Sequence, residues 1–316
     1  MSALNVSLFG KFSVRYDDKL LDCMDVYKAQ ELFCYLLLYP DRPHPRESLA
    51  GVLWGESSTS QSKKYLRQAL WQLQSALNTQ AGVDTACLLQ VEPDWICLNS
   101  RADLSLDVAV FERAFTGVKD VLGQKLDDRQ ADALQVAVNL YKGDLLEGWY
   151  QDWCLYERER LQNTYLAMLD KLMGYCEAHS QYEAGLVYGA HILRLDRAHE
   201  RTHRQLMRLQ YLAGDRTAAL RQFQRCAEVL DKDLGVKPDK STLALYDQIR
   251  TDQFVSAEPA ACGARSAPEA MFDSLPEVLS RLKQIMAVLT DIQHQVQKDI
   301  IAVEVALNGH RRPGRS

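Results

Sequence analysis

The feature that most constrains this chain is a stretch over residues 57–78 in which leucines recur at helical spacing. The leucines follow one another at steps of four, three and four residues, which places them on one face of a helix. A helix over residues 60–77 is therefore predicted to bury this stripe against a core, with Ser57 to Ser60 as alternative N-caps. The stripe consists of Leu66, Leu70, Leu73 and Leu77.

The opposite side of this predicted helix is polar and basic. Segment 57–78 contains two lysines, one arginine and no acidic residue, a local charge of +3 in a chain of net charge −5. Lys and Arg bind phosphates or guanine edges, Gln pairs with adenine, and Ser contacts phosphate oxygens, so this face suits a DNA major groove. A solvated helix packed on a core is the alternative, because a short basic run is compatible with both. The candidate DNA-contacting residues here are Ser60, Lys63, Lys64, Arg67, Gln68 and Trp71.

The segments before this helix predict a small sheet and two further helices. Residues 4–16 alternate apolar and polar around a Gly-Lys pair, as in a β-hairpin, and residues 19–23 add a third short strand. Helices are predicted at 28–39 and 46–54, and Gly55 is expected to end the second in the left-handed conformation. Lys28 and Arg46 lie near the starts of these helices and are further candidate phosphate contacts.

A second hairpin is predicted after the basic helix. Residues 88–91 and 95–98 are its strands, and Glu92-Pro93-Asp94 is its turn. A third helix followed by a hairpin is the order of a winged helix-turn-helix, with the hairpin as the wing. Glu92 and Asp94 would be repelled by phosphate, which disfavours insertion of this wing into DNA.

From Asp107 onward the sequence predicts helices alone. Leu172-Met173 recur as Leu206-Met207 at an offset of 34 residues, the tetratricopeptide period. Each such unit is a helical hairpin that must stack on its neighbours to bury its apolar face, which predicts a helical-repeat domain with a concave binding surface. Arg158 and Arg160 are predicted to lie on a solvated helical face. The predicted helices span residues 107–117, 129–141, 151–179, 181–194, 198–212, 216–231 and 240–251.

The C-terminal part has a different composition. Residues 253–274 are rich in Ala, Ser, Gly and Pro and are predicted to be a linker. Residues 275–308 are predicted to form a long amphipathic helix with heptad spacing. This pattern fits both a coiled coil that joins two copies into a homo-oligomer and a helix that docks on the chain's own body.

Composition and charge narrow the function classes. With 316 residues, two domains are expected, and a pI near 5.8 argues against a protein that coats nucleic acid through bulk charge. The eight cysteines include no CxxC pair, which favours reduced thiols over a disulfide framework or zinc site. The N-terminus lacks the layout of a signal peptide and no apolar run could span a bilayer, so a cytoplasmic protein with no membrane partner is expected.

One motif points towards an enzyme. Residues 199–203 spell H-E-x-x-H, in which two His can bind zinc and the Glu can act as base. Here the motif lies inside a predicted repeat unit without a clear third ligand nearby, so surface histidines are the expected alternative. The sequence therefore predicts no catalytic residue, cofactor or metal ion.

Several separate motifs, taken together, resemble a known family. They are SLFGKFSV (7–14), YLLLYPDRPHPRESLAGVLWG (35–55), YLRQALWQLQSAL (65–77), GDLLEGWYQDWCLYERERL (143–161) and GDRTAALRQFQRCAEVLDKDLGVKP (214–238). Over residues 4–250 the chain resembles a short-form member of the SARP type of bacterial transcriptional activator. That resemblance implies an OmpR-type winged helix joined to a bacterial transcriptional activator domain of tetratricopeptide-like helices.

The resemblance sets the expected organisation and function. The fold is expected to be mainly α, with a winged helix over residues 1–105, a repeat domain over 106–252, the linker, and the helix over 275–308. Family members bind repeats in promoter DNA and contact RNA polymerase, so double-stranded DNA and the polymerase are the implied partners, and no enzyme activity is implied. A helical-repeat scaffold whose winged helix binds proteins is the alternative from another class.

Overall fold

The computed structural model describes residues 4–17, 19–21, 26–40, 42–81, 88–99 and 102–253, without the side chains of residues 79–81. All of these residues belong to one compact unit, which spans residues 1–257. The predicted linker, apart from Gln253, and the predicted helix over 275–308 lie outside the described residues and stay predictions. Within the described ranges, no helix is long and apolar enough to cross a membrane.

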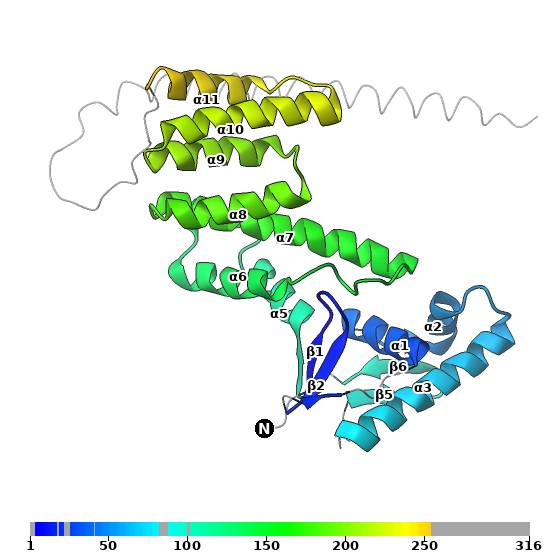
Figure 1. Ribbon diagram of the computed structural model, residues 1–316. Coiled ribbons are helices and arrows are strands. Elements are labelled where there is room, and N and C mark those ends of the chain that lie inside the picture. Colours follow the sequence, from blue (N-terminus) through cyan, green and yellow to red (C-terminus); the bar gives the residue numbers. More distant parts are fainter. Residues whose placement is uncertain are drawn as a thin grey trace, which may run out of the picture. The chain divides into compact units, whose positions relative to one another are not determined.

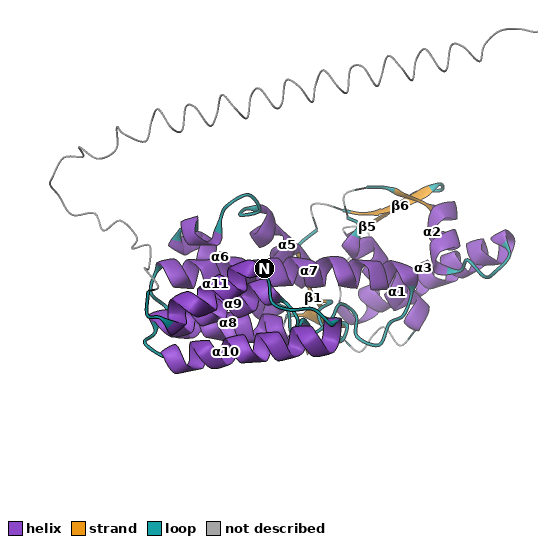
Figure 2. Ribbon diagram, turned by 90° about the horizontal axis from the view of Figure 1, so that it is seen from above, coloured by secondary structure: helices purple, strands orange, loops and turns teal. Residues whose placement is uncertain are grey.

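Strands are confined to the N-terminal part of the compact unit (Figure 2). β1 (Leu4–Ser7) pairs antiparallel with β2 (Ser13–Tyr16), as predicted, and β2 pairs with β3 (Lys19–Leu20). Alternate residues of β1 are buried, because one face of this small sheet lies on the core. A strand that was not predicted, β7 (Leu104–Leu106), pairs parallel with β1 and completes the order β3-β2-β1-β7. Its three residues are too few for a sequence pattern to reveal.

Three helices and a hairpin follow in the predicted winged-helix order (Figure 1). They are α1 (Tyr27–Leu38), α2 (Arg46–Leu53), α3 (Thr59–Ala81), and the wing strands β5 (Leu89–Val91) and β6 (Trp95–Leu98). The short strand β4 (His44–Pro45), which was not predicted, pairs with β6 and ties the wing to the start of α2. All four leucines of the predicted stripe on α3 are buried.

The role of Gly55 differs from the prediction. Gly55 is not among the residues with positive φ, so it does not end α2 in the left-handed conformation. Instead, a Cβ at this position would lie 2.9 Å from the carbonyl oxygen of Gly51. The turn after α2 therefore requires glycine because the chain passes close to the preceding helical turn.

The second half of the compact unit consists of stacked helices (Figure 1). The predicted helices are confirmed, each to within two residues at either end, and a short 3-10 turn (Gly123–Lys125) and a π-helical turn (Leu230–Leu234) are added. The repeated Leu172-Met173 on α7 and Leu206-Met207 on α9 are all buried, as stacked repeat units require. The helices are α5 (Asp107–Thr116), α6 (Asp128–Leu140), α7 (Asp152–Ala178), α8 (Tyr182–Leu195), α9 (Glu200–Leu212), α10 (Arg216–Val229) and α11 (Lys240–Arg250).

Gly189 allows α8 to approach its neighbours closely. A Cβ there would lie 2.5 Å from Leu206 Cδ2 and 2.9 Å from Met173 Cε, and both of these side chains are buried. We expect Gly189→Ala to lower the free energy of unfolding by about 1 kcal/mol or more, because overpacking outweighs the gain in helix propensity. Gly51→Ala in α2 is the matched control, since nothing lies within 4 Å of its Cβ position, and it should stabilise by about 0.5–1 kcal/mol. Urea denaturation measures both, and equal effects would contradict the packing argument.

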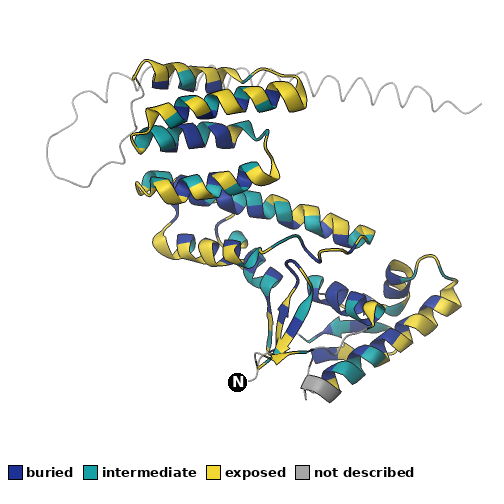
Figure 3. Ribbon diagram, viewed as in Figure 1, coloured by how far each residue is buried: buried dark blue, intermediate teal, exposed yellow. Residues whose placement is uncertain are grey.

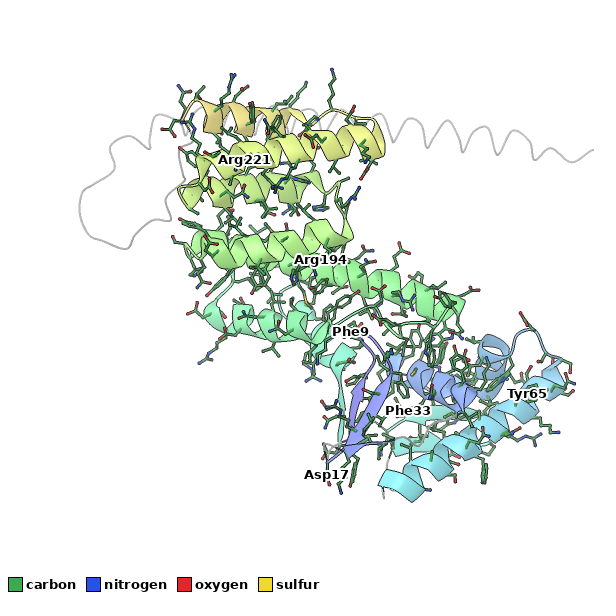
Figure 4. All side chains as sticks on the ribbon, in the orientation of Figure 1. Phe9, Asp17, Phe33, Tyr65, Arg194 and Arg221 are labelled. Atoms are coloured by element: carbon green, nitrogen blue, oxygen red, sulfur yellow. The ribbon has the colours of Figure 1, made fainter. Side chains whose placement is uncertain are left out.

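The N-terminal part and the repeat helices share one hydrophobic core. Phe9, in the loop after β1, packs against Phe111 of α5 and Tyr141 after α6, with ring centroids 5.0 and 4.8 Å apart (Figure 4 labels Phe9). The carboxylate of Asp107 accepts backbone N–H bonds from Leu8 and Phe9 at 2.9 and 3.0 Å. The predicted domain boundary between residues 105 and 106 stays a prediction.

Arg158 corrects the expectation of a solvated face. Its guanidinium donates to the backbone carbonyl oxygens of Leu145, Leu146 and Trp149 at 2.9–3.0 Å. It thereby holds the irregular segment before α7 in place. Arg160 is exposed, as predicted, and pairs with Glu157 and Glu112.

Candidate nucleic-acid interface

The candidate interface is the side of α3 that faces away from the core. Figure 3 shows α3 with buried residues on one side and exposed residues along the other. Leucines at helical spacing fix the inner side, so the residues between them are necessarily turned outward. The structure exposes Ser60, Lys63, Lys64, Arg67, Gln68 and Trp71 on this helix.

Four of these side chains are available to a ligand. No hydrogen bond, ion pair or ring contact joins Lys64, Arg67, Gln68 or Trp71 to another residue in the described part of the chain. Trp71 is 67% exposed, which is unusual for the largest apolar side chain. At 100° per residue, Lys64, Arg67 and Trp71 share one side of the helix, about one turn apart from each other. A row of a lysine, an arginine and an aromatic ring can contact phosphates, base edges and apolar base surfaces together.

A residue that sequence reasoning did not single out fixes the start of α3. Ser62 is buried, and its hydroxyl donates to the carbonyl oxygens of Trp54 and Ser58 at 3.0 and 3.1 Å. These bonds tie the first turn of α3 to the end of α2. A serine among three others carries no sequence signal for such a role, because only the fold brings Trp54 beside it.

The remaining candidates have partners within the protein. Lys28 Nζ donates to the Leu53 carbonyl at 2.7 Å and pairs with the buried Glu31 at 2.7 Å. Arg46 Nη1 donates to the carbonyl of Glu92 at 3.1 Å. Lys28 thus stabilises the C-terminal end of α2, and Arg46 stabilises the turn of the wing.

Lys63 pairs with Glu47 at the first turn of α2, at 2.5 Å. The ammonium group lowers the pKa of the Glu47 carboxyl by a hydrogen bond. Both side chains are substantially exposed, so the pair is screened by solvent and is easily exchanged for another anion.

A groove of about 650 Å³ separates α3 from the wing turn. Arg46, Lys63 and Arg67 contribute three positive charges to its lining, and Glu47 and Asp94 contribute two negative charges. Asp94 and Glu92 are exposed at the wing tip, as predicted. The positive charge of this region therefore lies towards α3 and not at the wing tip.

The H-E-x-x-H motif is not arranged as a zinc site. His203 Nε2 lies 3.0 Å from the Arg197 carbonyl, and its Nδ1 lies 2.8 Å from the side-chain nitrogen of Gln222. Both ring nitrogens are therefore occupied, and burial lowers the pKa of His203 so that the neutral ring is favoured. Glu200 accepts bonds from Thr242 Oγ1 and the Asp239 backbone N–H. The motif stabilises the contacts of α9 with α10 and α11.

Comparison with known proteins gives three findings. Residues 106–250 match the family model of the bacterial transcriptional activator domain. The regulatory protein AfsR of Streptomyces coelicolor is 25% identical over 245 residues, which is 76% of this chain and 24% of AfsR. The chain thus spans about a quarter of the length of that relative.

The third finding concerns the fold. The solved structure of EmbR from Mycobacterium tuberculosis, in complex with a low-affinity phosphopeptide, superposes with a TM-score of 0.62 and 19% sequence identity. The match covers 81% of this chain and 67% of the EmbR chain. It therefore includes more of the chain than the repeat helices alone.

Proposed function

We propose that the chain is a regulator of the SARP type, which binds promoter DNA through its winged helix and activates transcription; the match of residues 106–250 to the bacterial transcriptional activator domain and the similarity to AfsR support this proposal. In this proposal α3 enters the major groove. Its exposed side contacts bases and phosphates, and its leucine stripe stays on the core.

One observation carries the proposal. Lys64, Arg67, Gln68 and Trp71 face solvent from a single helix without a partner among the described residues, in a chain of net charge −5. A helix with only a structural role has no need of unpaired cations and an exposed tryptophan in one row. DNA supplies partners for each of these groups.

The ion pair of Lys63 fits the same proposal. When a phosphate approaches, Lys63 can exchange Glu47 for it at little cost, because both groups are exposed. In this proposal Lys28 and Arg46 do not contact DNA themselves. They stabilise α2 and the wing turn, which lie beside α3. The acidic wing tip stays outside the minor groove.

The repeat helices are proposed to contact RNA polymerase or a neighbouring protomer. The stacked helices offer large exposed surfaces at a fixed position relative to α3, because both parts share one core. A regulator that binds repeated DNA sites brings two copies close together, which gives such contacts a function.

The test is binding of the purified chain to its own upstream DNA and to scrambled DNA across a salt series. We expect selective, salt-dependent binding, and Lys64→Ala should lower affinity and reduce the salt slope by about one. Lys119→Ala is the control, since Lys119 is exposed in the loop after α5. Binding without sequence preference, unchanged by Lys64→Ala, would favour a winged helix that contacts proteins.

A further inference from the structure

A groove of about 540 Å³ runs between α8 and α10, with α9 as its floor. We call it the α8–α10 groove. Its apolar lining comes from Leu186, Leu193 and Leu206, of which the first two are partly exposed. A partly exposed row of leucines in a groove is typical of a surface that binds apolar side chains of a partner.

Cations surround this apolar lining. Three arginines line the groove: Arg194 on α8, Arg197 in the loop after α8, and Arg225 on α10. Glu228 is the acidic residue of the lining. Arg197 pairs with Asp233 at 3.3 Å. Arg194 and Arg225 are exposed and have no ion pair or hydrogen bond to any other described residue.

Arginines on the neighbouring helices α9 and α11, in contrast, have partners. Arg201 pairs with Asp170, Arg208 with Glu177, and Arg250 with Asp247. Figure 4 labels Arg194 on α8 and also Arg221, an exposed arginine one helical turn before Arg225 on α10. The two walls of the groove thus present unpaired positive charge in an otherwise acidic chain.

The floor of the groove contains the polar side chains of His203, Gln210 and Gln222. His203 and Gln222 bond to one another and are buried. The side-chain oxygen of Gln210, by contrast, is buried and has no partner among the described residues. An unpaired buried acceptor costs free energy, and a donor in the groove reaches this oxygen only if the Gln210 side chain turns towards the groove.

We propose that the α8–α10 groove binds an acidic peptide segment of a partner protein. The carboxylates of the segment pair with Arg194 and Arg225, and its apolar side chains lie on the three leucines. Leucines and Glu228 in the lining favour a peptide over a nucleic acid, whose phosphates need cations along the whole groove. The site is separate from α3, so its test does not depend on DNA binding.

The experiment uses the full chain and a fluorescein-labelled peptide of alternating Leu and Glu, followed by fluorescence anisotropy. We expect saturable binding that falls by about tenfold or more in the double variant Arg194→Glu/Arg225→Glu, because two attractions become repulsions. The double variant Lys119→Glu/Arg129→Glu is the charge-matched control, since Lys119 and Arg129 are exposed and lie outside this groove. It should bind the peptide as the wild type does.

Two further probes test whether the groove requires carboxylates and whether it binds a nucleic acid instead of a peptide. A peptide of alternating Leu and Gln should bind at least tenfold more weakly, because it lacks the carboxylates. A single-stranded oligonucleotide should bind Arg194→Glu/Arg225→Glu no more weakly than it binds the charge-matched variant Lys119→Glu/Arg129→Glu. The proposal is overturned by absence of Leu-Glu binding, by equal binding of the two peptides, by unchanged binding of Arg194→Glu/Arg225→Glu, or by a nucleic acid whose binding is lost in it.

Discussion

Replacing Arg67 with alanine is expected to weaken binding to the promoter by about 1–3 kcal/mol, roughly fivefold to 150-fold. Arg67 lies on the exposed side of α3 and also lines the groove beside the wing turn. Its five N–H donors can bind a guanine edge or a phosphate in two places at once, which no other residue on this side can do. Because Arg67 bonds to no other described residue, its loss should leave the stability of the protein unchanged.

The comparison that tests this expectation uses three variants and a salt series. Arg67→Lys keeps the charge without the planar guanidinium, so it should restore phosphate binding but not base selectivity. Arg129→Ala, on the exposed side of α6, controls for the change in net charge. Equal affinity of Arg67→Ala and Arg129→Ala for the promoter would show that α3 does not enter the major groove of the DNA.

Asp107→Ala is expected to lower the free energy of unfolding by about 2–4 kcal/mol. The Asp107 carboxylate accepts N–H bonds from Leu8 at 2.9 Å, Phe9 at 3.0 Å and Val108 at 2.8 Å. Alanine leaves the N–H groups of Leu8 and Phe9 at a buried position without their acceptor. Burial raises the pKa of Asp107 despite these bonds, so release of a desolvated charge offsets part of the loss.

Urea denaturation followed by circular dichroism measures this effect. Asp107→Asn keeps one acceptor oxygen and should lose less than Asp107→Ala. Asp103→Ala is the neutral control, because the Asp103 side chain is exposed and its backbone carbonyl still accepts the N–H of Leu4. If Asp107→Ala matched Asp103→Ala, the bonds from Asp107 to the N-terminal segment would contribute nothing to stability.

The helices of the repeat part could be predicted accurately because the apolar spacing that indicates a helix lies within one short stretch of sequence. The apolar stripes of α3, α7 and α9 each lie within one stretch of sequence, and burial on one side follows from their spacing. The side of α3 that faces outward could be predicted for the same reason. Spacing alone puts Arg67 and Trp71 opposite the leucines.

The partners of the charged candidates could not be predicted. Lys63 and Glu47 are 16 residues apart, and Lys28 lies 25 residues from the carbonyl that it binds. Sequence reasoning placed Lys28, Arg46 and Lys63 among the candidates by charge and position. The structure gives each of them a partner within the protein, which separates them from Lys64 and Arg67.

The sequence by itself determined the helices, the wing hairpin and the face of α3 that is free to bind, because residues a few positions apart fix these through backbone periodicity. Only the tertiary structure decided which cations are unpaired, that Arg158 holds the segment before α7, and that α8 and α10 enclose a groove with Arg194 and Arg225 on its walls. Those features depend on groups far apart in the chain that meet only when the helices stack. Contacts of this kind cannot be predicted from a local sequence pattern.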